Sequence, residues 1–245
     1  MNTVKILKTS ISETSVEEVS RILNNENSIK VAICNTNTVV RSYQDTLLCE
    51  VINSFDIKTP DGFPIAKSSS FFLKNNQQRV DGYKVFLSTI RKGIDKNTSH
   101  YFYGSEKSVV QKLITKLVEE FPEINIAGSF SPPIENYEDL TREEYIKDLE
   151  ECSPDIVWVS LGFPKQELFI ELLQKKYSIK SNLVGIGAVF EWVAGTKIKA
   201  PEFIANLGLE WVLRLAQEPR RLFKRYLIDN LLFLYLISKQ FISNK

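Results

Sequence analysis

The segment from residue 157 to residue 167, VWVSLGFPKQE, says most about the fold. It begins as a continuous apolar run, stops at Gly162 and continues with Pro164 and good helix formers. Residues 183–192, LVGIGAVFEW, repeat this change from an apolar run to glycine. Short apolar runs that end at glycine are typical of buried parallel strands, and ligands bind at the carboxyl ends of such strands. Both segments therefore predict an open α/β sheet with a ligand crevice at this edge.

On either side of these segments, short apolar runs alternate with longer stretches of helical periodicity. Strands are expected at residues 4–7, 29–34, 51–57, 100–103, 124–127, 155–161 and 183–186. Helices are expected after a capping box at Thr14–Glu17, after Asn35 through residue 48, and over residues 109–121, 140–150 and 165–177. Residues 67–97 show little pattern apart from a helical stretch that ends near residue 90. The alternation predicts an α/β fold with a Rossmann-like, mostly parallel sheet and flanking helices.

The C-terminal segment has a different character. From residue 202 onward there is no strand pattern, and Pro219 is a favourable first residue of a helix. We therefore predict an α/β core over residues 1–198 and a helical appendage over residues 199–245. From Lys197 to the end there are nine Lys or Arg and four Asp or Glu, although the whole chain carries only +1. The near-neutral total argues against a nucleic-acid partner. The local excess of positive charge predicts that the appendage meets phosphates or an acidic membrane surface.

The cysteines and the hydropathy indicate a cytosolic protein. Cys34, Cys49 and Cys152 are odd in number and far apart, so a disulfide framework or a zinc site is not expected. The N-terminus has no apolar signal core, and no run reaches the roughly 18 apolar residues of a membrane span. We predict a chain that is soluble or attached to a membrane surface.

Asp61 is the candidate for general-base chemistry. It lies in a Thr-Pro-Asp-Gly turn after an expected strand, which would project its carboxylate from the edge of the sheet. Such a carboxylate can deprotonate a hydroxyl group or bind a metal ion, although Asp-Gly turns are also common surface features. His100 is the only histidine and lies in an expected strand, so a histidine-based triad or metal cluster is excluded.

Residues 162–167 are the candidate phosphate site. Pro164 followed by helix formers predicts a helix N-terminus, whose free N–H groups and dipole favour an anion, and Lys165 adds a charge. The spacing fits neither a Walker loop nor a complete dinucleotide fingerprint, and Gly185-Ile186-Gly187 lacks the third glycine. An ordinary loop between a strand and a helix remains the alternative.

A cluster of arginines and lysines marks the appendage. The sequence WVLRLAQEPRRLFKR, residues 211–225, contains Arg214, Arg220, Arg221, Lys224 and Arg225, and arginine binds phosphate in a bidentate manner. Residues 227–241 are strongly apolar. A basic amphipathic helix of this kind either lies in a membrane interface or packs on the protein body or another subunit.

Read together, these motifs resemble the WecG/TagA/CpsF glycosyltransferases of bacterial surface polysaccharide synthesis. The resemblance rests on segments that span nearly the whole chain in the family's order: Asn35–Asn37, Pro60–Gly62, Arg79–Gly82, Leu161–Glu167, Gly185–Gly195, Ala200-Pro201, Gly208–Trp211, Arg214, Glu218–Arg220 and Arg225-Tyr226. The LGFPKQE and GLEWVLRLAQEPRR segments are the most specific.

The resemblance implies an inverting, metal-independent transfer of a sugar from a UDP-sugar to a polyprenyl-diphosphate-linked acceptor at the cytoplasmic face of the membrane. It implies that Asp61 is the catalytic base, with no cofactor beyond the donor substrate. The residues implied to bind the nucleotide sugar are Thr36, Asn37, Arg79, Gly104, Gly128, Gly162, Lys165, Gln166, Gly187, Glu191, Arg214 and Arg221. The appendage is implied to close over the diphosphate, and members of the family can form homo-oligomers.

Three departures from the family pattern leave the donor sugar open. Glu191 stands where the family often has Asp, Lys199 stands where it often has Arg, and residues 63–66 vary. N-acetylmannosamine, its uronic acid, glucose and glucuronic acid all remain candidates. A non-catalytic protein that binds nucleotide sugars or membranes is the alternative, and a metal-dependent enzyme that uses Asp61 is a third possibility.

Overall fold

A computed structural model describes residues 1–243, except for the side chains of residues 206, 221 and 224–226. Its centre is a six-stranded sheet in the order β4-β3-β8-β7-β5-β6, and every neighbouring pair is parallel. The strands are β3 (Lys30–Cys34), β4 (Ile57–Pro60), β5 (Ser99–Gly104), β6 (Asn125–Phe130), β7 (Ile156–Ser160) and β8 (Asn182–Gly185). The predicted α/β class with a Rossmann-like parallel sheet is confirmed.

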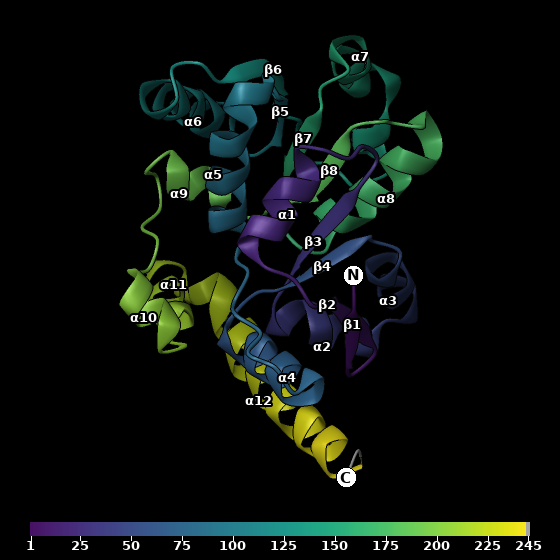
Figure 1. The fold of residues 1–245 in the computed structure, drawn as a ribbon, viewed down its shortest axis with the longest axis vertical. Coiled ribbons are helices and arrows are strands. Elements are labelled where there is room, and N and C mark those ends of the chain that lie inside the picture. The colour runs from purple at the N-terminus through teal and green to yellow at the C-terminus, as the bar shows by residue number, and fades with distance from the viewer. Residues whose placement is uncertain (244–245) are drawn as a thin grey trace.

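Helices cover both faces of the sheet, as Figure 1 shows. One face packs against α2 (Thr36–Gln44), α3 (Thr46–Asn53), α7 (Glu143–Cys152), α8 (Lys165–Tyr177) and α12 (Pro219–Ser243). The other packs against α1 (Val16–Leu23), α5 (Gly82–Gly93), α6 (Lys107–Glu120) and α9 (Val189–Val193). Short 3-10 turns, η1 (Ile94–Lys96) and η2 (Asp139–Thr141), and α4 (Phe63–Leu73) complete the core.

Strand β7 is apolar throughout because side chains on both of its faces are buried. Val157 and Val159 enter one hydrophobic cluster, whereas Ile156 and Trp158 enter the cluster on the opposite face, and all four are fully buried. A parallel strand covered on both faces has no solvent-facing positions, so alternation with polar residues is lost. The same arrangement divides the residues of β5 between the two clusters.

Two sequence-based expectations were wrong in detail, and one strand was not expected. Residues 51–57 are not one strand, because Val51 to Asn53 end α3 and only Ile57 begins β4. The cap of α1 is Ser15 rather than Thr14, since the Ser15 hydroxyl accepts from the backbone N–H of Glu18 at 3.1 Å. The strand expected at residues 4–7 is present as β1 (Thr3–Ile6), and it pairs in an antiparallel hairpin with β2 (Thr9–Ser12), which was not predicted.

The C-terminal segment is helical, as expected, and consists of α10 (Glu202–Asn206), α11 (Glu210–Gln217) and α12. Pro219 is the first residue of α12, which runs beside α2 and α4 away from the sheet (Figure 1). Phe233 and Ile237 on α12 are almost fully buried, and Gln240 exchanges hydrogen bonds with the backbone of residues 5 and 7. One face of α12 therefore packs on the core. Within residues 1–243, no helix is both long enough and apolar enough to cross a bilayer.

Candidate active site

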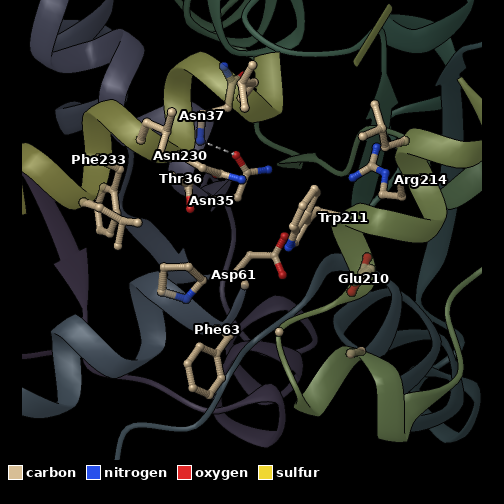
Figure 2. A pocket seen from close by; sticks show the side chains of 18 of the residues that line it. Asn35, Thr36, Asn37, Asp61, Phe63, Glu210, Trp211, Arg214, Asn230 and Phe233 are labelled. Carbon is tan, nitrogen blue, oxygen red and sulfur yellow. Dashed lines mark hydrogen bonds between the residues drawn. The ribbon is translucent and has the colours of Figure 1, made fainter. Parts of the chain in front are cut away.

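A cavity of about 420 Å³ lies at the carboxyl ends of β3 and β4, between the core and the C-terminal helices. It therefore opens at the edge of the sheet where the sequence predicted a ligand site. Figure 2 shows polar side chains on both walls of the cavity, with Asn35, Thr36 and Asp61 on the core side and Glu210, Arg214 and Asn230 on the helices opposite. The lining residues are Asn35, Thr36, Asn37, Asp61, Gly62, Phe63, Pro64, Arg79, Ala205, Gly208, Glu210, Trp211, Arg214, Leu215, Phe223, Leu227, Asn230, Leu231, Phe233 and Leu234.

Asp61 is fixed at the cavity by the end of β4. Its backbone N–H donates to the carbonyl oxygen of Cys34 at the end of β3, at 2.9 Å, which extends the pairing of the two strands. The chain then turns sharply at Gly62, whose φ of +78° suits glycine, and enters α4 through Pro64 near its first turn. This geometry directs the carboxylate into the cavity, where it faces Trp211 in Figure 2.

The surroundings of Asp61 favour its protonated form. Burial, followed by the nearby carboxylates of Glu210 and Asp81, raises the pKa of this carboxyl to about 7, against the lowering effect of Arg79 and Arg214. Burial matters most because an ionised carboxylate loses hydration at the wall of the cavity. A group with a pKa near 7 can both accept and release a proton at neutral pH, which is what general-base catalysis requires.

The loop after β3 forms a second polar wall. The side-chain oxygen of Asn35 accepts from the backbone N–H groups of Asn37 and Thr38, at 3.0 and 3.2 Å, and so caps α2. The amide of Asn37 donates to the buried carboxylate of Asp229 on α12. Thr36 and Asn37 thus line the cavity as predicted, while Asn37 also attaches the C-terminal helix to the core.

Arg79 is held between two carboxylates. Its Nη2 donates to Asp81 at 2.9 Å and its Nη1 donates to Glu210 at 2.7 Å. Asp81 is itself the N-cap of α5, where its other oxygen accepts from the backbone N–H of Lys84. Next to Arg79, the N–H of Val80 donates to the carbonyl of Pro60, which keeps the guanidinium beside Asp61. The sequence predicted Arg79 as a site residue, whereas Glu210 was noted only as part of the Gly208–Trp211 segment and its role at the site was missed.

Arg214 reaches the cavity from α11. Its guanidinium carbon lies 5.3 Å from the centre of the Trp192 ring, so a cation–π contact holds the charge at the cavity wall. Arg221 belongs to α12, but its side chain lies outside the described part of the structure, and its predicted role stays a prediction. Of the predicted arginine cluster, only Arg214 is among the described residues that line the cavity.

The family model described as "Glycosyl transferase WecG/TagA/CpsF family" matches residues 3–245. The chain belongs to the WecG/TagA/CpsF glycosyltransferase family. Its curated relatives include proteins named N-acetylglucosaminyldiphosphoundecaprenol N-acetyl-beta-D-mannosaminyltransferase from two Bacillus species and from Staphylococcus aureus strain MW2.

The similarity to these relatives is moderate and covers most of the chain. The Bacillus spizizenii protein is 34% identical over 70% of the chain and 64% of its own length, so the match spans less than two thirds of that relative. The Bacillus subtilis protein is 29% identical over 78% of the chain and 72% of its own length. The Staphylococcus aureus protein is 25% identical over 91% of the chain and 86% of its own length.

Gln166, the residue of the LGFPKQE segment predicted to contact the nucleotide sugar, lies outside the lining of this cavity. Its side-chain oxygen accepts from the backbone N–H of Gly187 at 3.0 Å, and its nitrogen donates to Glu167 at 2.8 Å. Only 3% of Gln166 is exposed. In this WecG/TagA/CpsF chain Gln166 therefore braces the loops after β7 and β8 against each other. Contact with a nucleotide stays a prediction for Gln166.

Four other predicted residues accompany Gln166 at the ends of β7 and β8. Gly162 and Gly187 adopt positive φ values of +77° and +58°, and nothing lies within 4 Å of a Cβ built on either. Lys165 begins α8, and Glu191 lies on α9, where it pairs with Lys197 at 3.5 Å. These residues lie at the ends of strands that neighbour β3 and β4 in the sheet but do not line the cavity, so their contact with a nucleotide sugar stays a prediction.

Gly104 and Gly128 have a structural explanation of their own. A Cβ on Gly104 would lie 2.4 Å from the carbonyl oxygen of Ser160, and one on Gly128 would lie 2.7 Å from the Tyr101 ring. Close packing between neighbouring strands therefore requires glycine at both positions, whether or not a ligand binds there. Neither residue lines the cavity around Asp61.

The carboxylates around Arg79 are already engaged in ion pairs. Asp81 and Glu210 both pair with its guanidinium. Among the described residues, no group of three His, Cys, Asp or Glu side chains has the arrangement of a metal site. Metal independence stays a prediction, and the chemistry of this site is best described through its carboxylates and arginines.

Proposed function

We propose that the chain transfers a sugar from a UDP-sugar to an undecaprenyl-diphosphate-linked sugar acceptor, with inversion at the anomeric carbon and without a metal ion. N-acetylmannosamine is the donor sugar that fits the names of the relatives. A hexose or hexuronic acid is the alternative donor. The observation that carries the proposal is a single cavity that combines Asp61, whose pKa is near 7, with Arg79 and Arg214.

In the proposed reaction, Asp61 takes the proton from an acceptor hydroxyl as this oxygen attacks the anomeric carbon. The bond from that carbon to the UDP oxygen breaks on the opposite side, and the diphosphate leaves with the electron pair. Arginines and helix N-termini can stabilise the departing negative charge. The position of Arg214 at the cavity wall, in contact with Trp192, supports this role, as does the N-terminus of α8 after β7.

The proposed site of action is the inner face of the cytoplasmic membrane. On α12, Leu227, Leu231 and Leu234 are 51 to 61% exposed and continue from the cavity wall. An apolar helix face of this kind, beside basic residues, suits a membrane interface. A second copy of the chain is the alternative partner for this face, because family members can associate. Flotation with anionic liposomes, together with the molar mass in solution, would distinguish these two partners.

Product formation is the direct test of the proposal. The purified protein would be incubated with UDP-N-acetylmannosamine and an N-acetylglucosamine-diphosphate-lipid acceptor, alongside UDP-glucose and UDP-glucuronic acid. We expect a lipid-linked disaccharide with one donor of this panel. If UDP binds but no donor in the panel yields product, the non-catalytic alternative is favoured and the proposal fails.

A further inference from the structure

The contact between Arg79 and Glu210 joins two parts of the chain that are 131 residues apart. Arg79 belongs to the segment that runs beside the end of β4, and Glu210 is the first residue of α11. Side-chain exposures of 12% and 21% show that the ion pair is largely shielded from solvent. A shielded ion pair with a hydrogen bond of 2.7 Å is costly to break, because each charge would be left without its partner.

The same guanidinium is fixed from the core side. Asp81, which has a side-chain exposure of 7%, accepts from the other terminal nitrogen of Arg79 and also caps α5. With one carboxylate at each end, the plane of the guanidinium is fixed. Arg79 stays beside Asp61 only while both partners are in place, and one of these partners belongs to the appendage.

We propose that Glu210 is a positioning residue of the transfer reaction, because it holds Arg79 beside Asp61 and holds α11 over the cavity through one and the same contact. When α11 docks on the core, the same contact therefore positions Arg79 beside Asp61. The inference rests on the proposed function for its catalytic consequence. Its structural consequence, that Glu210 holds α11 down, can be tested without any substrate.

The charges that surround Asp61 explain why this contact affects the base itself. Asp81, Glu210, Arg79 and Arg214 are the charged groups that act on it, from the β4 edge, from α5 and from α11. Replacing Glu210 with a neutral amide removes one negative charge from this set. Loss of this charge lowers the pKa of Asp61, whereas release of Arg79 raises it. Glu210 has the larger effect of the two, so the net change lets Asp61 ionise at lower pH and makes it a weaker base.

The chain offers a matched control. Glu202 on α10 also pairs with a core lysine, Lys84, but the two side chains are 62% and 40% exposed and neither lines the cavity. Exposed ion pairs contribute little to stability. Glu202→Gln removes an ion pair between appendage and core without touching the cavity, whereas Glu210→Gln removes the shielded pair beside Asp61.

The experiment compares wild type, Glu210→Gln, Glu210→Asp and Glu202→Gln by hydrogen exchange of α11 and by the pH dependence of kcat/KM. For Glu210→Gln we expect at least about tenfold faster exchange in α11 and a kcat lowered by about tenfold or more. We also expect its acid limb to move to lower pH by roughly half a unit. Glu210→Asp should recover part of kcat and return the limb towards wild type, and Glu202→Gln should behave as wild type.

Two results would overturn the inference. One is exchange in α11 that is the same in Glu210→Gln as in wild type. The other is an acid limb that stays in place while activity falls equally at every pH, which a purely structural role would produce. If wild type itself forms no product, the proposed function fails, but the exchange measurement still decides whether Glu210 holds the appendage. Melting temperatures of all variants would show which of them remain folded.

Discussion

Replacing Asp61 with asparagine should stabilise the protein at neutral and alkaline pH. Burial and neighbouring carboxylates raise the pKa of this carboxyl from 3.8 to about 7 in the folded state. An acid whose pKa is raised by folding lowers stability as it ionises. The loss is absent below about pH 4, grows between pH 4 and pH 7, and is complete above pH 7. Asparagine has a similar shape and carries no charge, so it avoids this loss.

The size of the effect follows from the shift in pKa. A difference of about three pKa units corresponds to roughly 4 kcal/mol at 1.36 kcal/mol per unit, which is an upper limit. The carboxyl lies at the wall of an open cavity, so solvent screening reduces this figure, and we expect about 1–2 kcal/mol. For a chain of this length, that gain corresponds to a rise in Tm of about 2–8 °C above pH 7.

The assay is thermal unfolding of wild type and Asp61→Asn at several pH values from 4 to 9. The difference in Tm should be near zero at pH 4, increase through pH 7 and then level off. Asp95→Asn is the control, since Asp95 is exposed on η1 and should change Tm little at any pH. A variant that is less stable than wild type at pH 8 would refute the electrostatic account of the site.

Three further predictions concern the metal, the packing of the sheet and the attachment of α12. Activity should be unchanged in excess chelator, and a loss that added Mg²⁺ or Mn²⁺ restores would contradict a metal-independent reaction. Gly104→Ala should lower stability by about 2–4 kcal/mol, because its Cβ would meet the Ser160 carbonyl at 2.4 Å with φ at +110°. Gly187→Ala is the control, because nothing lies within 4 Å of a Cβ at this position, and it should lower stability by only about 1 kcal/mol. Equal losses of stability in the two variants would refute the packing argument. Asp229→Ala should speed hydrogen exchange in α12, since its buried carboxylate binds Asn37, and unchanged exchange would mean that apolar packing alone holds this helix.

Local patterns in the sequence predicted most of the sheet. Continuous apolar runs that end at glycine or at polar residues are sufficient to place β3, β7 and β8, because buried parallel strands leave this signature. The same logic failed at residues 51–57, where an apolar stretch belongs partly to the end of α3. A short apolar run fits either a helix or a strand, and its period alone does not decide between them.

The predicted site is only partly reproduced by one cavity. Thr36, Asn37, Asp61, Arg79 and Arg214 line it, and all five were predicted. The loops around Gln166 lie beside this cavity, and local sequence does not show that a glutamine reaches across to the next loop.

Glu210 was missed for a related reason. Its partner, Arg79, is 131 residues away, and only the folded chain brings the two together. Long-range pairs of this kind leave no periodic signal in a single sequence. The GLEW segment was noticed for its resemblance to the family, but nothing in it indicated which core residue its glutamate would meet.

The central claim is that Asp61 is the base of a sugar transfer from a UDP-sugar to a lipid-diphosphate-linked acceptor. The most direct measurement compares product formation and UDP binding for wild type and Asp61→Asn under saturating substrates. Loss of a general base lowers the rate by about 10²–10⁴-fold, and we expect a loss in that range with UDP affinity nearly unchanged. Turnover within a few-fold of wild type in the Asp61→Asn protein would contradict the claim.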